Sequence, residues 1–233
     1  MLDQLPINKI KWFRRQMKIW AAENLRDFSW RNTKDPYKIL VAELLLQKTN
    51  AATVAPVYQK LIDRYPTLND LAVAPAEDVT TLLQPLGLNF RADRLSRLTQ
   101  VVLEWYGGKI PTTEAQLLEL PGVGKYTAKS VCTHAFGQRK AVLDTNVARI
   151  LERFFGFSGG RVKSRCPKLQ LAAEELAPKT KLSEWNLALL DFGAIVCTAR
   201  NPHCAKCPLR QQCEYAIPKA PLNEKMVSKP IYK

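Results

Sequence analysis

Four cysteines near the C-terminal end have the most specific spacing in the chain. Cys197, Cys204, Cys207 and Cys213 follow the pattern C-x6-C-x2-C-x5-C. Thiolates this close together in sequence are typical of a bound metal, and four of them suit either Zn²⁺ or a [4Fe-4S] cluster. A reducing compartment would disfavour the disulfide alternative. The spacing therefore predicts a metal centre, and by itself it leaves the choice of metal open.

A glycine-rich turn is the second chemical feature. Gly122, Val123 and Gly124 follow Pro121 and precede an apolar helical pattern that begins at Lys125. Glycine permits a tight turn at positive φ and leaves no side chain over the backbone amides. The amides at the start of a helix can then bind an anion such as phosphate. The simpler interpretation is a helical hairpin that binds nothing.

Two carboxylates occupy unusual surroundings. Glu43 interrupts the apolar run 37–49, where burial should raise its pKa and allow it to donate a proton or to order a water. Asp144 precedes an expected helix, whose dipole should favour the ionised form at neutral pH. Each has a simpler interpretation, because aspartate is a common helix cap and Glu43 could lie on a narrow solvated strip.

The charge balance indicates a polyanionic partner. The 233 residues include 35 Lys and Arg against 21 Asp and Glu, for a formal net charge of +14. Nucleic acid is the first candidate and an anionic membrane surface the second. No apolar run approaches the length of a membrane span, and the first residues do not read as a secretion signal. We therefore expect a cytoplasmic protein associated with the nucleoid.

The elements that must position these residues are all predicted to be helices. Apolar residues recur at helical spacing, and no stretch shows sustained alternation of period two, so the fold class is predicted to be all-α. Helices are expected at residues 9–27, 37–49, 52–65, 68–73, 76–84, 91–105, 146–155, 167–177 and 181–194, with a capping box formed by Thr113 and Gln116. Residues 218–233 are polar, basic and proline-rich, and are expected to be a disordered tail.

The segment LPGVGKYTA followed by VLDTNV resembles the helix-hairpin-helix and catalytic aspartate of the endonuclease III superfamily of DNA glycosylases. Residues 28–215 resemble its iron-sulfur branch, whose four cysteines match this spacing. The resemblance implies a [4Fe-4S] cluster and two helical modules with DNA and an extruded base in the cleft between them. Residues 27–134 would form a six-helix module with the hairpin, and residues 1–26 with 135–217 the cluster module.

The resemblance also implies roles for the site residues. A glycosylase must flip its target base out of the duplex and cleave through an oxocarbenium-like sugar cation. Asp144 would stand beside that cation, and Glu43 would donate to the departing base or order a water. Tyr126 occupies the position at which bifunctional relatives carry an imine-forming lysine, which a phenol cannot replace. We therefore expect a monofunctional enzyme with little or no AP lyase activity, unless Lys125 or Lys129 supplies a weak one. The simpler interpretation of Tyr126 is an aromatic that packs the hairpin.

The substrate is expected to be thymine or uracil opposite guanine in double-stranded DNA, bound by a monomer. Residues 85–91, PLGLNFR, lack the tyrosines of the GLGYYSR loop of adenine glycosylases, and the chain stops soon after its cysteines. Adenine opposite guanine or 8-oxoguanine is the alternative, since VAELLLQKT resembles the VSEVMLQQT stretch of those enzymes. A non-catalytic iron-sulfur protein that binds DNA is the alternative from another class. Besides the hairpin, the residues expected to contact DNA are Arg31, Gln47, Lys48, Leu88 and Arg200.

Overall fold

The computed structural model describes residues 5–87 and 90–217, and within these ranges it contains helices and no strand. The all-α prediction is therefore confirmed. The helices are α1 (Ile7–Asn24), α2 (Pro36–Leu45), α3 (Ala51–Arg64), α4 (Leu68–Ala72), α5 (Ala76–Leu83), α6 (Phe90–Tyr106), α7 (Glu114–Glu119), α8 (Lys125–His134), α9 (Thr145–Phe155), α10 (Pro167–Leu176) and α11 (Leu182–Ile195). Short 3-10 turns lie between several of them, including Ser29–Arg31 and Gln84–Leu86.

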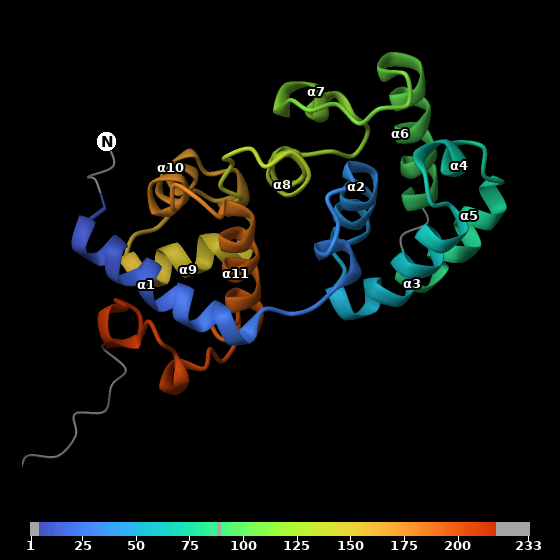
Figure 1. The fold of residues 1–233 in the computed structure, drawn as a ribbon. Helices are drawn as coiled ribbons and strands as arrows, with labels where there is room; N and C mark the ends of the chain where they lie inside the picture. Colours follow the sequence, from blue (N-terminus) through green and yellow to red (C-terminus); the bar gives the residue numbers. More distant parts are fainter. Residues whose placement is uncertain (1–4, 88–89, 218–233) are drawn as a thin grey trace, which may run out of the picture.

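The buried apolar side chains form two separate cores, and we call the helices around each core a module. One core runs from Trp30, just before α2, to Cys132 of α8. The other takes Leu5 and residues of α1 as far as Met17, and then residues 141–216, from just before α9 onward. Figure 1 shows the two groups of helices side by side, with α2 and α8 facing the junction. The chain leaves the second module after α1 and returns to it after α8.

A buried ion pair ties the two modules together. Asp191 of α11 is fully buried and accepts hydrogen bonds from both Arg31 Nη1 and Arg31 Nη2, at 2.7 and 2.9 Å. Arg26 adds its Nε at 2.7 Å and its backbone amide. Burial alone would raise the pKa of Asp191, and these contacts hold it below its usual value instead. The linker between α1 and α2 is thus anchored to α11.

The end of α2 and the cap of α7 differ from what the sequence predicted. The apolar run that starts α2 was expected to stay helical to residue 49, and the helix ends at Leu45. Lys48 adopts a left-handed conformation at φ 60°, so residues 46–49 turn out of the helix. The Thr113 hydroxyl caps α7 by accepting from the Gln116 amide, and it donates to Gln116 Oε1 in place of the second capping-box bond.

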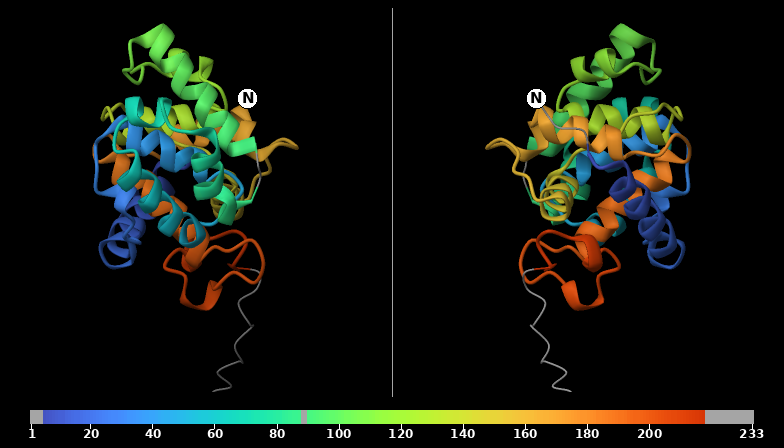
Figure 2. Two further views of the ribbon diagram at one scale, coloured as in Figure 1. Left: turned by 90° about the vertical axis from the view of Figure 1, so that its right-hand side faces the viewer. Right: turned by 90° about the vertical axis from the view of Figure 1, so that its left-hand side faces the viewer.

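The cysteine-bearing segment lies at one end of the molecule, beyond α1, and Figure 2 shows it projecting below the rest. The expected disordered tail at 218–233 and the expected DNA contact Leu88 lie outside the described residues. Among the described helices, none combines the length and the apolar character that crossing a membrane would require.

Candidate active site

Glu43, Tyr126 and Asp144 converge at the junction of the two modules. Glu43 lies on α2, which packs against α8, and its Oε1 accepts a 2.6 Å hydrogen bond from Ser130 Oγ. Burial raises the pKa of Glu43 to about 7, although Ser130, the positive charge of Arg31 and the Tyr126 hydroxyl lower it. Asp144 is near enough to raise the same pKa. A carboxyl with this pKa exchanges its proton near neutral pH.

Tyr126 stands in the first turn of α8 and is only partly exposed. Burial raises the pKa of its hydroxyl well above the usual range, and the negative charges of Glu43 and Asp144 act in the same direction. The phenol therefore stays neutral at physiological pH and keeps a proton to donate. Its side chain offers no amine, so it cannot form an imine with an abasic sugar.

Asp144 is both the cap of α9 and a side chain of this site. Its Oδ1 accepts from the Val147 amide at 2.7 Å, and its Oδ2 accepts from Asn146 Nδ2 at 2.6 Å. Burial nevertheless raises its pKa, and it outweighs these bonds and the nearby Arg149. The helix end favours the ionised form through these hydrogen bonds, as expected from the sequence, while desolvation, which the sequence did not reveal, acts against it.

The segment around the first cysteine braces α9 and so positions Asp144. Arg149 donates to the carbonyl oxygens of Cys197 and Gly193 at 2.7 and 2.8 Å, and to Asn146 Oδ1 at 2.8 Å. A Cβ on Gly193 would lie 2.5 Å from Asn146 Cβ, so a glycine is needed where α11 meets the start of α9. Asn146 in turn holds the Asp144 carboxyl.

The four cysteines of the predicted metal centre gather in one loop region. Burial and the other three thiols raise the pKa of Cys207 to about 12, so Cys207 needs a nearby cation to be a thiolate at neutral pH. Four thiols that lie near enough to affect one another are a donor set that suits a [4Fe-4S] cluster.

The glycine turn has the geometry of an anion site. Gly122 adopts φ 81°, and Gly124 precedes α8 with open space where a Cβ would stand. No side chain caps α8, and Lys125 is exposed at its start. The first amides of α8 are thus available to a phosphate. Val123 of the same turn was also expected to contact DNA. Its side chain is instead buried in the core, and its amide donates to the Leu120 carbonyl.

Gln47 links the hairpin turn to α6. Its Nε2 donates to the Gly122 carbonyl at 3.0 Å, and its Oε1 accepts from Arg94 Nη1 at 2.9 Å. Arg91 donates to the Gln47 carbonyl and to Thr49 Oγ1, both at 2.6 Å. Residues 47–49 and the hairpin turn are therefore held by α6 as one surface.

The other expected DNA contacts fall in different places. Lys48 and Arg200 are exposed, Lys48 beside Gln47 and Arg200 in the loop between the first two cysteines. Arg31 was expected at the DNA surface, and the structure places it elsewhere. Its side chain is 10% exposed and both terminal nitrogens bond Asp191, because a buried carboxylate needs a counterion. It lies close enough to Glu43 to lower the pKa of that carboxyl.

Sequence reasoning missed Ser130, Asn146, Arg149 and Arg94. Ser130 could have been found from its position four residues after Tyr126, which places both on one face of a helix. Asn146 and Arg149 could have been found because both lie near the start of the helix that Asp144 caps. Nothing in the sequence indicates that Arg94 reaches Gln47, because that contact depends on how α6 packs.

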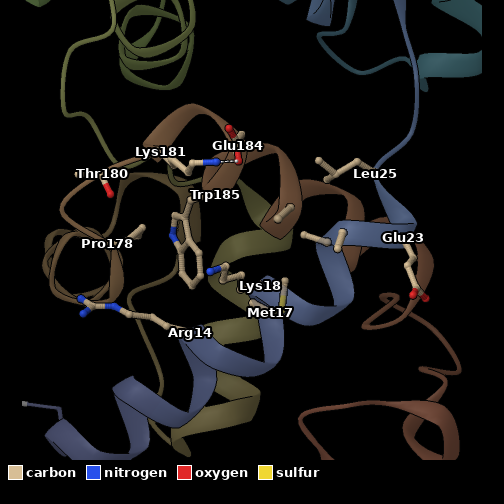
Figure 3. A pocket seen from close by; sticks show the side chains of 13 residues that line it. Arg14, Met17, Lys18, Glu23, Leu25, Pro178, Thr180, Lys181, Glu184 and Trp185 are labelled. Carbon is tan, nitrogen blue, oxygen red and sulfur yellow. Dashed lines mark ion pairs between the residues drawn. The ribbon is translucent and has the colours of Figure 1, made fainter.

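A hollow of about 640 Å³ lies away from these side chains and is lined by α1, α11 and the loop before α11. Figure 3 shows Trp185 at its centre, with Arg14 and Lys18 nearby. None of Glu43, Tyr126 or Asp144 belongs to its lining.

The chain matches two family models. Residues 41–176 match the HhH-GPD superfamily base excision DNA repair protein, and residues 197–213 match the iron-sulfur binding domain of endonuclease III. The second match covers all four cysteines and supports the predicted [4Fe-4S] cluster.

Similar proteins carry related names. The chain is 40% identical to a thymine/uracil-DNA glycosylase of Methanothermobacter thermautotrophicus, over 84% of this chain and 89% of that protein. It is 36% identical to the human adenine DNA glycosylase, over 86% of this chain and 39% of that protein. A solved structure of a thermostable thymine-DNA glycosylase superposes with a TM-score of 0.86 at 38% identity, covering 91% of this chain and 98% of that one.

Proposed function

Because the chain belongs to the HhH-GPD superfamily of base excision DNA repair proteins, we propose that it is a DNA glycosylase that removes thymine or uracil opposite guanine. The observation that carries this proposal is the convergence of Glu43, Tyr126 and Asp144 beside a helix start open to phosphate. Three polar groups of this kind at a module junction suit one everted nucleotide.

We propose a task for each group from its position. The hairpin turn and Lys125 hold a phosphate of the strand whose nucleotide is turned out. Asp144, held by Val147 and Asn146, stabilises the positive charge that develops on the sugar. Glu43 exchanges a proton with the departing base or with the attacking water. Tyr126 keeps its proton and lines the base pocket as a hydrogen-bond donor.

The reaction is proposed to be hydrolysis without strand cleavage. Lys129, one turn along α8, forms a 3.2 Å ion pair with Glu174 of α10, which holds its amine away from the sugar. Lys125 is exposed at the turn, where phosphate is its natural partner. In the first turn of α8, the position at which bifunctional relatives carry an imine-forming lysine is occupied by Tyr126. Borohydride should therefore not trap the wild-type protein on an abasic duplex, and strong trapping would overturn this point.

The cluster is proposed to act through structure. Cys197, Cys204, Cys207 and Cys213 would hold it, and when bound it would supply a rigid cross-link for the loop that carries them. The loop in turn fixes Arg149 and Arg153, which donate to the carbonyls of Cys197 and Thr198. Exposed Arg200 projects from the same loop and is proposed to meet the DNA backbone, while Gln47 and Lys48 meet the opposite strand.

The base specificity is tested directly by single-turnover incubation with labelled duplexes. We expect alkali-labile sites with G:T and G:U pairs, and little with A:G or A:8-oxoguanine. Cutting confined to the adenine duplexes would replace this proposal with an adenine glycosylase, which the human relative makes the second candidate. Binding without cutting of any duplex would favour the non-catalytic DNA-binding protein. The proposed monomer is checked by sedimentation with and without DNA, and nucleoid association by imaging a fluorescent fusion.

A further inference from the structure

Ser130 is a residue that neither the sequence motifs nor the proposed reaction assigns to the site. It lies on α8, is completely buried, and stands four residues after Tyr126 on the same face of the helix. Its hydroxyl donates to Glu43 Oε1 at 2.6 Å, across the interface between α8 and α2. A short bond from a fully buried donor restricts the carboxyl far more than a solvent-exposed contact would.

We infer that Ser130 is a positioning residue for the glycosylase reaction, because its hydroxyl fixes Glu43 Oε1 and thereby sets the orientation and the charge state of that carboxyl. The inference rests on the proposed function, in which Glu43 exchanges a proton during base removal. The hydrogen bond holds Glu43 Oε1 against α8, so the carboxyl cannot turn away from that helix. Oε2 is then the oxygen that meets the base or the water.

The groups that shift the pKa of Glu43 come from the turn before α2, from α8 and from the start of α9. Arg31 of the turn Ser29–Arg31 lowers the pKa of Glu43, and Asp144 at the start of α9 raises it. From α8, Ser130 and Tyr126 both lower it by hydrogen bonding. Ser130 ranks second only to burial among these causes, and it also acts on the Tyr126 hydroxyl. Removing Ser130 therefore removes the largest influence that keeps Glu43 ionisable near neutral pH.

The direction of the effect does not depend on which proton step Glu43 performs. If Glu43 must be protonated, activity falls above its pKa, and if it must be ionised, activity falls below it. Ser130→Ala raises that pKa in either case, so the limb of the pH-rate profile controlled by Glu43 moves to higher pH. A hydrogen bond to a charged group corresponds to a shift of about one pH unit.

The test measures single-turnover cutting of a G:U duplex from pH 5 to pH 9 for three variants. Ser130→Ala should move the limb upward by about one pH unit. Ser130→Thr keeps the hydroxyl and should restore the wild-type limb. Thr133→Val is the matched control, since it removes another buried hydroxyl of α8, one that donates to the Lys140 carbonyl, and should leave the limb in place. An unmoved limb in Ser130→Ala, an equal shift in Thr133→Val, or no restoration by threonine would each overturn the inference.

A second measurement does not depend on activity. Carbon-13 NMR of protein labelled at the glutamate carboxyl carbons follows the titration of Glu43, with Glu43→Gln identifying the signal. The midpoint should rise in Ser130→Ala and not in Thr133→Val. If the wild-type protein cuts no duplex, the proposed function fails, and the NMR midpoint still decides whether Ser130 controls Glu43. An unchanged midpoint would refute the inference even in an active enzyme.

Discussion

Glu43 is a buried carboxyl whose usefulness to the reaction carries a cost in stability. Its pKa is raised to about 7 in the folded protein, chiefly by burial. A raised carboxyl pKa means that the folded state binds the proton more tightly than the unfolded state, so the cost is absent below the unfolded pKa and complete above pH 7. Glu43→Gln should therefore unfold at a higher temperature than wild type at pH 8 and at the same temperature at pH 4, while cutting is lost. The gain at pH 8 should be about 1 to 3 kcal/mol, allowing for partial exposure of the site.

Thermal unfolding of both proteins at the two pH values checks this prediction. Glu184→Gln is a suitable control, because its side chain is 64% exposed and pairs only with exposed Lys181. That control should show no comparable gain at pH 8. Equal unfolding temperatures of wild type and Glu43→Gln at pH 8 would contradict the burial argument.

Asp144 serves two tasks, and a single substitution separates them. Asp144→Asn keeps an oxygen that can cap the Val147 amide, so α9 should remain folded. It removes the negative charge beside the developing cation, which should lower the single-turnover rate by at least about 100-fold. Binding to a G:T duplex, measured by fluorescence anisotropy, should stay within a few-fold of wild type. Cutting at the wild-type rate would mean that Asp144 is a cap and nothing more.

At the residue scale, sequence alone identified the side chains that meet in the site and erred on their environment. Spacing and residue type were enough to single out Glu43, Tyr126 and Asp144. They did not reveal that burial raises the pKa of Asp144, because desolvation depends on packing by distant segments. Arg31 shows the same limit, since its partner Asp191 lies 160 positions away.

At the scale of elements, the hairpin turn depends on its two glycines for different reasons. Gly122 needs its positive φ, and a Cβ there would meet the Arg94 side chain at 2.1 Å. Gly124 has an ordinary φ and open space around it. Gly122→Ala should therefore destabilise the fold by about 1 kcal/mol or more and also weaken DNA binding. Gly124→Ala should leave stability unchanged and weaken binding alone, by covering the amides that meet phosphate.

Urea unfolding and anisotropy titrations on the two variants distinguish these effects. Loss of stability in Gly124→Ala, or none in Gly122→Ala, would show that the turn is built differently. The helices themselves were largely predictable, because apolar periodicity and caps such as Asn50 and Thr113 are local signals. The end of α2 was not, since the left-handed turn at Lys48 is fixed by the contacts of Arg91 and Arg94 with Gln47.

At the scale of the whole molecule, the buried ion pair of Asp191 with Arg26 and Arg31 joins the modules. Asp191→Asn leaves two arginines without their counterion and should cost about 3 to 5 kcal/mol of unfolding free energy. Asp78→Asn is the matched control, because Asp78 and Arg64 form an exposed pair that should be worth less than about 1 kcal/mol. Chemical denaturation measures both. Similar losses of unfolding free energy in the two variants would mean that the buried pair does not hold the modules together.

The cluster is the second feature of the whole molecule. Its loss should disturb the candidate site, because the cysteine-bearing loop is bonded to α9. Cys204→Ser should remove the broad visible absorbance expected of an iron-sulfur protein and lower the unfolding temperature. The single-turnover rate should fall more than the affinity for DNA, since Arg149 ties Cys197 to Asn146 while the hairpin belongs to the other module. A colourless wild-type protein containing zinc would show that the metal was assigned wrongly.

The Arg31 guanidinium connects the contact between the modules to the acidity of Glu43. It donates hydrogen bonds to Asp191 of α11, and its positive charge also lowers the pKa of Glu43, which lies in the other module from α11. Arg31 follows Trp30, whose side chain packs in the core of the module that holds Glu43, so a movement of the modules would part Arg31 from Asp191 and leave it beside Glu43. The guanidinium without its carboxylate would then act on Glu43 alone, so the acidity of Glu43 would depend on how closely the two modules are held together.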